Sequence, residues 1–184
     1  MPMFPKPMGH GTFTVEPFSA YRARLPISFN EIPDSVIESW IYRHWDDFQS
    51  WLILNPLKWK YSLTMLTSNE VLMISHVNDW PSTLTYWGDD LIDGSQRMTT
   101  WLGSYILEHG TTPTPMIVAF CFDGIEHPRE PGFAMKKPYQ IIEGHMRLAY
   151  FQALIRRRHF AVKPRHEVYL VELPVTIRCS GRPL

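Results

Sequence analysis

The residues best suited to chemistry stand together in one short segment, Glu143-Gly144-His145-Met146-Arg147. Apolar residues before this segment predict a strand and those after it predict a helix, so the glycine stands at a strand-to-helix turn. Such a turn gathers backbone N–H groups at the helix start, and the helix dipole adds partial positive charge there. His145 and Arg147 add side-chain donors, and an arginine can hold two phosphate oxygens. The segment predicts a phosphate-binding site; the alternative is an ordinary turn with a surface arginine.

The same segment predicts how a bound phosphate would react. Glycine lets the backbone approach a ligand closely, so we expect Gly144, His145, Met146 and Arg147 to hold the phosphates of a nucleotide. His145 and Arg147 would stabilise the charge of the transition state. Glu143 is the third candidate catalytic residue, because its carboxylate could orient water or bind a metal ion. Mg²⁺ is the expected ion, since it is commonly held by one or two carboxylates together with substrate phosphates.

A charged loop further along the chain could reach over the same ligand, because loops on a rigid scaffold often carry functional residues. Asp123 and Glu126 are candidate additional metal ligands, and Arg129 is a candidate phosphate contact. His127 and Glu130 belong to the same loop. The alternative interpretation is a solvated connection between two strands.

The elements that must position these residues alternate between strands and helices, which predicts an α/β fold. The unbroken apolar run 116–122 is typical of a buried strand, and 139–142 is a second short strand. A helix is expected from about 145 to 158, followed by a closing strand at 167–173. Before them, Asp93 is expected to cap a helix that Gly110 ends in a left-handed conformation.

The first half of the chain is rich in aromatic residues. Apolar residues at helical spacing predict a helix from 31 to 54, and two strands at 60–66 and 71–76 are expected to form a hairpin around 67–69. An irregular stretch follows at 77–90. The tryptophans of this half either fill a core or form a contact surface for a protein partner; they are Trp40, Trp45, Trp51, Trp59, Trp80 and Trp87.

Length and composition bound the possible classes of protein. The 184 residues suit one domain, expected over 13–174 between a flexible tail at 1–12 and a second tail at 175–184. The net charge of zero argues against a dedicated DNA-binding module, although the basic run Arg156-Arg157-Arg158 is a candidate nucleic-acid contact. The two cysteines fit a reducing cytosol, and no apolar run is long enough to span a membrane, so we expect a cytoplasmic protein.

Residues 95–174 resemble the ParB/sulfiredoxin superfamily. The resemblance rests on the helix-forming segment 99–110 with its final glycine, the segment Thr114-Pro115 with the apolar run after it, the Gly-His-x-Arg turn at 144–147, and the closing strand around 168–171. It implies a compact α/β fold with a small mixed sheet and helices around it, and a nucleotide bound over the turn. Members of this superfamily include CTPases, sulfiredoxins, a free-serine kinase, nucleases and plasmid fertility-inhibition proteins.

Two departures narrow what the resemblance implies. The turn lacks the cysteine that sulfiredoxins need. Because the last expected strand is followed only by the tail 175–184, we do not expect the basic helix-turn-helix region that follows the nucleotide core in partitioning proteins. The leading hypothesis is an ATP-hydrolysing enzyme that also cleaves DNA and acts to block conjugative or T-DNA transfer. A phosphotransferase that moves a phosphate from ATP or ADP to a small hydroxylated acceptor is one alternative. A non-catalytic inhibitor that binds a protein partner is the other.

Overall fold

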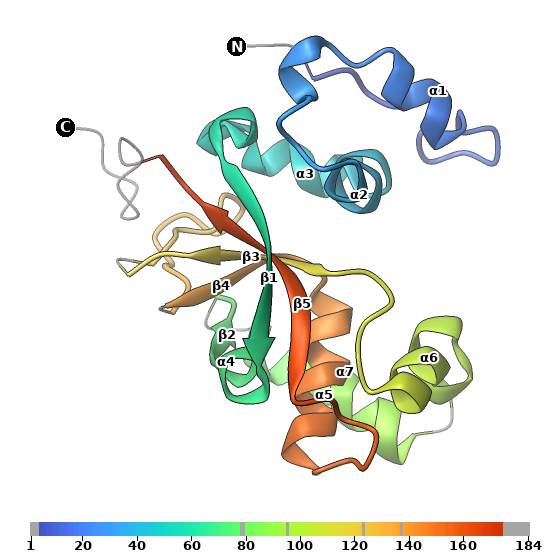
Figure 1. The fold of residues 1–184 in the computed structure, drawn as a ribbon, viewed down its shortest axis with the longest axis vertical. Coiled ribbons are helices and arrows are strands. Elements are labelled where there is room, and N and C mark those ends of the chain that lie inside the picture. Colours follow the sequence, from blue (N-terminus) through green and yellow to red (C-terminus); the bar gives the residue numbers. More distant parts are fainter. Residues whose placement is uncertain (1–3, 78–79, 95, 123, 137, 175–184) are drawn as a thin grey trace. The chain divides into compact units, whose positions relative to one another are not determined.

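The computed structural model describes residues 4–77, 80–94, 96–122, 124–136 and 138–174, and the chain forms two compact units, residues 1–61 and 62–184 (Figure 1). The expected C-terminal tail, 175–184, lies outside the described residues. The expectation of one domain over 13–174 stays a prediction. Helices and strands are both present, so the expected mixed α/β fold class is confirmed. None of the described helices is both long enough and apolar enough to cross a membrane.

The N-terminal unit is built from short helices around an aromatic core. Its helices are α1 (Phe18–Ala23), η1 (Ile27–Phe29), α2 (Asp34–Val36), η2 (Ile37–Tyr42), α3 (Trp45–Trp51), η3 (Leu52–Leu54) and η4 (Pro56–Lys58). The predicted helix over 31–54 is therefore a series of shorter helices. The ring of Phe4 packs against Phe29 and Phe48, with centroids 5.1 and 5.0 Å apart, and the expectation of a flexible tail over 1–12 stays a prediction.

Four tryptophans hold this aromatic core together. Trp40, Trp45, Trp51 and Trp59 are at most 5% exposed. Trp40 stacks on Trp59 with ring centroids 5.8 Å apart and meets Trp51 edge-on at 6.3 Å. Of the two interpretations that the sequence allowed, the one that places these four residues in a core is correct, and the one that places them on a contact surface is wrong.

The C-terminal unit carries a five-stranded mixed sheet in the order β1-β5-β3-β4-β2. Its elements are β1 (Lys60–Thr67, whose first two residues belong to the N-terminal unit), α4 (Ser68–Met73), β2 (Ile74–Ser75), α5 (Trp80–Asp93), η5 (Arg97–Thr99), α6 (Trp101–His109), β3 (Met116–Phe120), β4 (Tyr139–Glu143), α7 (His145–Arg156) and β5 (Arg165–Glu172). Strand β3 runs parallel to β5 and antiparallel to β4, while β2 runs parallel to β4. The strands expected from 116, 139 and 167, and the helix expected from 145, are confirmed.

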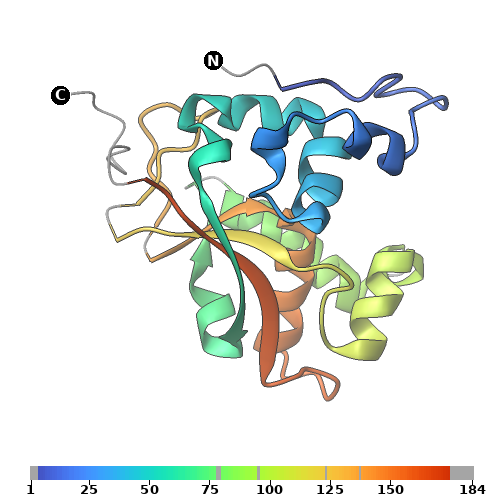
Figure 2. The same ribbon diagram turned by 45° about the horizontal axis from the view of Figure 1, so that its top comes forward.

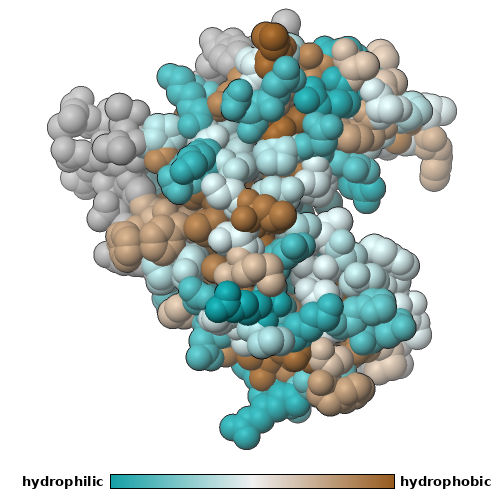
Figure 3. All heavy atoms as spheres, viewed as in Figure 1, coloured by the Kyte–Doolittle hydropathy of each residue, from teal (hydrophilic) through white to brown (hydrophobic). Residues whose placement is uncertain are grey.

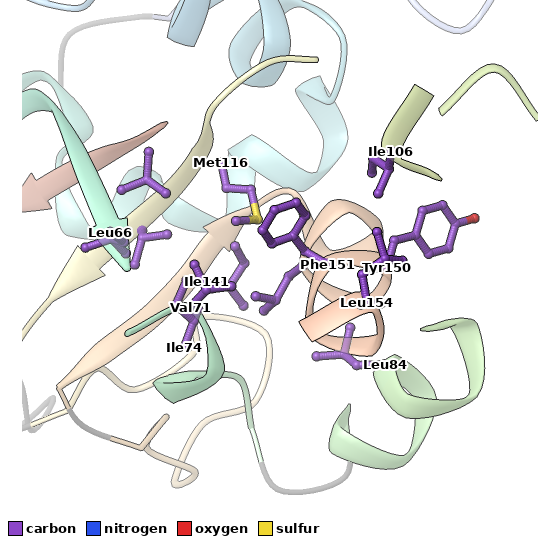
Figure 4. Packing of buried hydrophobic residues seen from close by; sticks show 14 of the residues in the cluster. Leu66, Val71, Ile74, Leu84, Ile106, Met116, Ile141, Tyr150, Phe151 and Leu154 are labelled. Atoms are coloured by element: carbon purple, nitrogen blue, oxygen red, sulfur yellow. The ribbon is translucent and has the colours of Figure 1, made fainter. Parts of the chain in front are cut away.

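Helix α7 is the centre of this unit. It packs against α4, α5 and α6 and lies beside the sheet (Figure 2). Its apolar side chains meet those of the sheet (Figure 4). Phe151 and Leu154 of α7 lie in one cluster with Met116 and Ile141 of the sheet and Leu84 of α5. A helix covered on several sides has buried residues all around it, and every residue from Arg147 to Leu154 is buried.

Three local predictions before α7 are wrong. Thr67 does not begin a hairpin turn: its hydroxyl accepts a hydrogen bond from the Glu70 amide at 3.3 Å, and the Glu70 carboxylate accepts one from the Thr67 amide at 2.7 Å. This capping box starts α4, which includes residues 71–73 of the strand expected at 71–76, while Ile74–Ser75 of that strand form β2. The stretch expected to be irregular contains α5, and Asp93 is the last residue of that helix. The helix that Asp93 was expected to cap is α6, and its N-cap is Thr100, whose hydroxyl accepts a hydrogen bond from the Gly103 amide. Gly110 does end α6 in a left-handed conformation, as predicted.

Candidate functional site

The sheet topology brings three chain segments to one edge of the C-terminal unit. Strands β2 and β4 are parallel neighbours, with Ile74 opposite Tyr139, so the residues that follow both strands emerge at the same edge. His76 follows β2, and Gly144 with His145 follows β4. Strand β3 is antiparallel to β4, so the segment that precedes β3 lies at this edge as well. In α/β sheets, ligands commonly bind beyond the carboxyl ends of parallel strands.

The turn between β4 and α7 has the conformation that the glycine predicts. Gly144 precedes α7 with a φ of 106°, which an L-residue rarely adopts, and no side chain caps the helix there. The Leu148 amide donates to the Gly144 carbonyl at 2.8 Å, which closes the first turn. The amides of the first turn therefore lie at the end of the helix that carries partial positive charge.

Arg147 turns back from α7 and fastens the segment that precedes β3. Its Nη1 donates to the carbonyl oxygens of Thr114 at 2.9 Å and Pro115 at 3.0 Å, and to the Thr114 hydroxyl at 2.5 Å. Its Nη2 lies 3.5 Å from Oε1 of Glu143. Arg147 is 8% exposed and Glu143 is 9% exposed. The guanidinium is thus engaged with the protein itself, and its predicted contact with phosphate stays a prediction.

Three histidine rings meet beside this turn. The centroid of the His76 ring lies 4.9 Å from that of His127 and 4.7 Å from that of His145, the first residue of α7. Trp80, the first residue of α5, lies 4.8 Å from the His76 ring and 5.7 Å from the His145 ring. Imidazole nitrogens both donate and accept protons, so the cluster gathers several polar atoms in a largely buried place.

His76 is the most buried member of the histidine cluster. The residue is 3% exposed, and its Nδ1 has no hydrogen-bond partner in the part of the chain that the structure describes. Burial, and then the nearby His145 and His127 rings, lower the pKa of the His76 imidazole from 6.5 to about 3. The ring is therefore neutral at physiological pH, and a buried ring nitrogen without a partner favours the binding of a ligand that supplies one.

The charged loop contributes its histidine to the cluster. Nδ1 of His127 accepts a hydrogen bond from the Arg129 amide at 3.2 Å, so Nε2 carries the proton when this ring is neutral. The Arg129 side chain is exposed. The Glu126 carboxylate accepts a hydrogen bond from the Gly132 amide within the loop. Asp123, the remaining candidate metal ligand, lies outside the described residues.

The described candidate metal ligands and the candidate nucleic-acid contacts lie in different parts of the C-terminal unit. Within the described part of the chain, no group of three His, Cys, Asp or Glu residues could hold a metal ion. The side chains of Arg156, Arg157 and Arg158 are exposed at the end of α7. Arg157 pairs with Asp93 of α5 at 2.6 Å, so part of its charge is used to join the two helices.

The sequence identified the turn but not the whole site. Nη2 of Arg147 lies 3.5 Å from Oε1 of Glu143, and the His145 ring packs against His76. Met146, between His145 and Arg147 in the chain, is 40% exposed. The role of these residues in one site stays a prediction. His76 and Trp80 were not expected there, because only the pairing of β2 with β4 brings them to this edge. A histidine directly after a short apolar strand was the available signal, and by itself it favours an ordinary boundary residue.

Comparisons of the chain with protein-family models, with curated proteins and with solved structures found no match.

Proposed function

We propose that the C-terminal unit binds a nucleotide at the start of α7 and hydrolyses ATP. The observation that carries the proposal is the buried Nδ1 of His76, which has no hydrogen-bond partner among the described residues and belongs to a ring 4.7 Å from that of His145. Phosphate oxygens are strong acceptors for such a nitrogen. The likeness of the Gly-His-x-Arg turn and the elements around it to the ParB/sulfiredoxin superfamily supports the same ligand.

The start of α7 suits the charge of a triphosphate. The partial positive charge of the helix end attracts anions, and the first-turn amides are donors for phosphate oxygens. His145 stands at this position, and the His76 and His127 rings extend the donor surface beyond it. Donors held in place before the reaction stabilise the additional negative charge that develops during phosphoryl transfer.

Glu143 and Arg147 take different roles in this proposal. Arg147 is a positioning residue that fixes the turn through Thr114 and Pro115 and adds positive charge near the phosphates. Glu143 would orient the attacking water or serve as a protein ligand for Mg²⁺, which needs only one or two carboxylates when it arrives with a nucleotide. When bound, Mg²⁺ would supply neutralisation of the phosphate charge.

The test is release of phosphate from ATP in the presence of Mg²⁺. His145→Phe keeps an aromatic ring against His76 and Trp80 but removes the ring nitrogens, so turnover is expected to fall by about 10²-fold or more. His109→Phe is the matched control, because His109 lies at the end of α6 and contacts the Tyr105 ring. This control is expected to keep wild-type turnover, and circular dichroism would show that both variants are folded.

Two outcomes would count against the proposal. Equal turnover in wild-type protein and His145→Phe would remove the cluster from the reaction. Absence of turnover in the wild type would sink the ATPase proposal. ADP formation that required a small hydroxylated compound would then identify the phosphotransferase, since transfer needs an acceptor other than water.

DNA cleavage is a second candidate activity, and the exposed arginines Arg156 and Arg158 favour it. They lie at the opposite end of α7 from the histidine cluster, where they could hold the phosphate backbone of DNA. Nicking of a supercoiled plasmid by the wild type, with reduced nicking by Arg156→Glu/Arg158→Glu, is the expected result. Unchanged nicking in the double variant would remove these arginines from the DNA contact.

A further inference from the structure

We propose that Trp80 is a specificity-determining residue, and that the aromatic base of the bound nucleotide stacks on its indole ring. This inference rests on the proposed function, because it places the base relative to phosphates at the start of α7. Trp80 is half-buried and lies beside both His76 and His145. The His76 and His145 rings thus offer polar atoms suited to phosphate, while the adjacent Trp80 ring offers an aromatic surface.

The indole of Trp80 is held in place from behind. Trp87, two turns further along α5, meets it edge-on with centroids 6.1 Å apart and an interplanar angle of 80°. The Arg97 guanidinium lies over the Trp87 ring at 5.6 Å. Arg97 is in turn fixed by the Asp90 carboxylate at 2.7 Å and the Tyr150 hydroxyl at 3.2 Å. A ring supported in this way loses little conformational freedom when a ligand stacks on it.

The partial exposure of Trp80 favours a role in stacking with a base over a role in core packing alone. The tryptophans that only fill the core of the N-terminal unit are almost completely covered, as Trp40 at 0% exposure shows. Trp80 keeps part of its surface accessible although it belongs to the aromatic network of the histidine cluster. Stacking uses the π-face that every nucleobase has, so this contact distinguishes nucleotides from simple phosphates rather than one base from another.

The test compares the affinities of ATP and inorganic tripolyphosphate for the full chain by isothermal titration calorimetry. Tripolyphosphate carries the phosphates without a base, so the ratio of the two affinities measures what the base contributes. A stacked base strengthens binding by roughly 5- to 150-fold. Trp80→Leu is expected to lower the affinity for ATP more than the affinity for tripolyphosphate, so that the ratio falls towards one, and Trp80→Phe is expected to retain part of the ratio.

Trp101→Leu is the matched control, because Trp101 is a 70% exposed tryptophan on α6 of the same unit. It is expected to keep the wild-type ratio, and circular dichroism would confirm the fold of each variant. Equal affinities of wild-type protein for ATP and tripolyphosphate, or an unchanged ratio in Trp80→Leu, would overturn the role of Trp80 while leaving the phosphate site intact. Failure of both compounds to bind would overturn the proposed function itself.

Discussion

The guanidinium of Arg147 occupies the space beside Gly144 that a larger residue would need. A β-carbon at position 144 would lie 3.1 Å from Nε and 3.2 Å from Nη2 of Arg147, and 3.0 Å from Cγ of Met116. The glycine therefore does more than relax the turn between β4 and α7. It gives Arg147 room to fold back and reach Thr114 and Pro115.

Gly144→Ala is expected to destabilise the C-terminal unit by about 1–3 kcal/mol, because the β-carbon forces both a strained φ and a displacement of Arg147. Urea unfolding followed by circular dichroism would measure the change. Gly132→Ala is the matched control: Gly132 also has a positive φ, of 87°, but a β-carbon there would meet nothing within 4 Å. A cost at Gly144 no larger than at Gly132 would show that crowding of Arg147 contributes nothing.

Arg147→Met is expected to lower the free energy of unfolding by about 3 kcal/mol or more, since it removes the guanidinium that pairs with the largely buried Glu143 carboxylate. Adding Glu143→Gln to this variant removes the negative charge of the carboxylate and should recover part of the lost free energy of unfolding. The double variant would then be more stable than the sum of the two single effects predicts. Urea unfolding of the four proteins measures this coupling.

The exposed pair of Arg157 and Asp93 is the control for the buried pair of Arg147 and Glu143. Its side chains are 50% and 58% exposed, so Arg157→Met should change stability by less than about 1 kcal/mol. Additive effects of the Arg147 and Glu143 substitutions would instead mean that the two side chains act independently, and that Thr114 and Pro115 are the important partners of Arg147.

The sequence predicted the second half of the fold well because its signals there are local. The apolar run of β3 and the glycines at 110 and 144 each mark one element without reference to distant residues. Helix α5 was missed because Pro81 and Gly88 look like helix breakers. Proline is tolerated in the first turn of a helix. Gly88 packs close to α7, where a β-carbon would lie 2.5 Å from the Ala149 carbonyl oxygen.

The candidate site also combines residues that local sequence predicts with residues that only long-range strand pairing brings in. Glu143, His145 and Arg147 are neighbours in the chain, so their types and spacing predicted a shared site. His76 joins them only through the parallel pairing of Ser75 with Gln140, which connects distant parts of the chain. His127 was expected as a loop residue that could reach the ligand, and the structure places its ring against His76. Long-range strand pairing leaves little trace in a single sequence, so the histidine cluster could not be derived from it.

The two most buried histidines of the C-terminal unit predict how its stability depends on pH. Burial is the main cause that lowers the pKa of His76 to about 3 and that of His166 to about 4, from 6.5. Both rings bind a proton more readily in the unfolded chain, so the unfolded state takes up protons as the pH falls below 6.5. Their contribution to stability is complete above that value and is lost progressively towards pH 4 and 3.

We expect the free energy of unfolding to fall between about pH 7 and pH 5, by on the order of 1 kcal/mol for each ring after allowance for solvent screening. Urea unfolding at several pH values would measure this slope. His76→Phe and His166→Phe each keep a ring in the core but cannot be protonated, so each should flatten the slope. His109→Phe, which alters a partly exposed ring, should leave it unchanged. A slope in His76→Phe as steep as in the wild type would mean that the His76 ring is already protonated in the folded protein, or that it becomes so without cost, and its place as a neutral donor beside His145 would then be untenable.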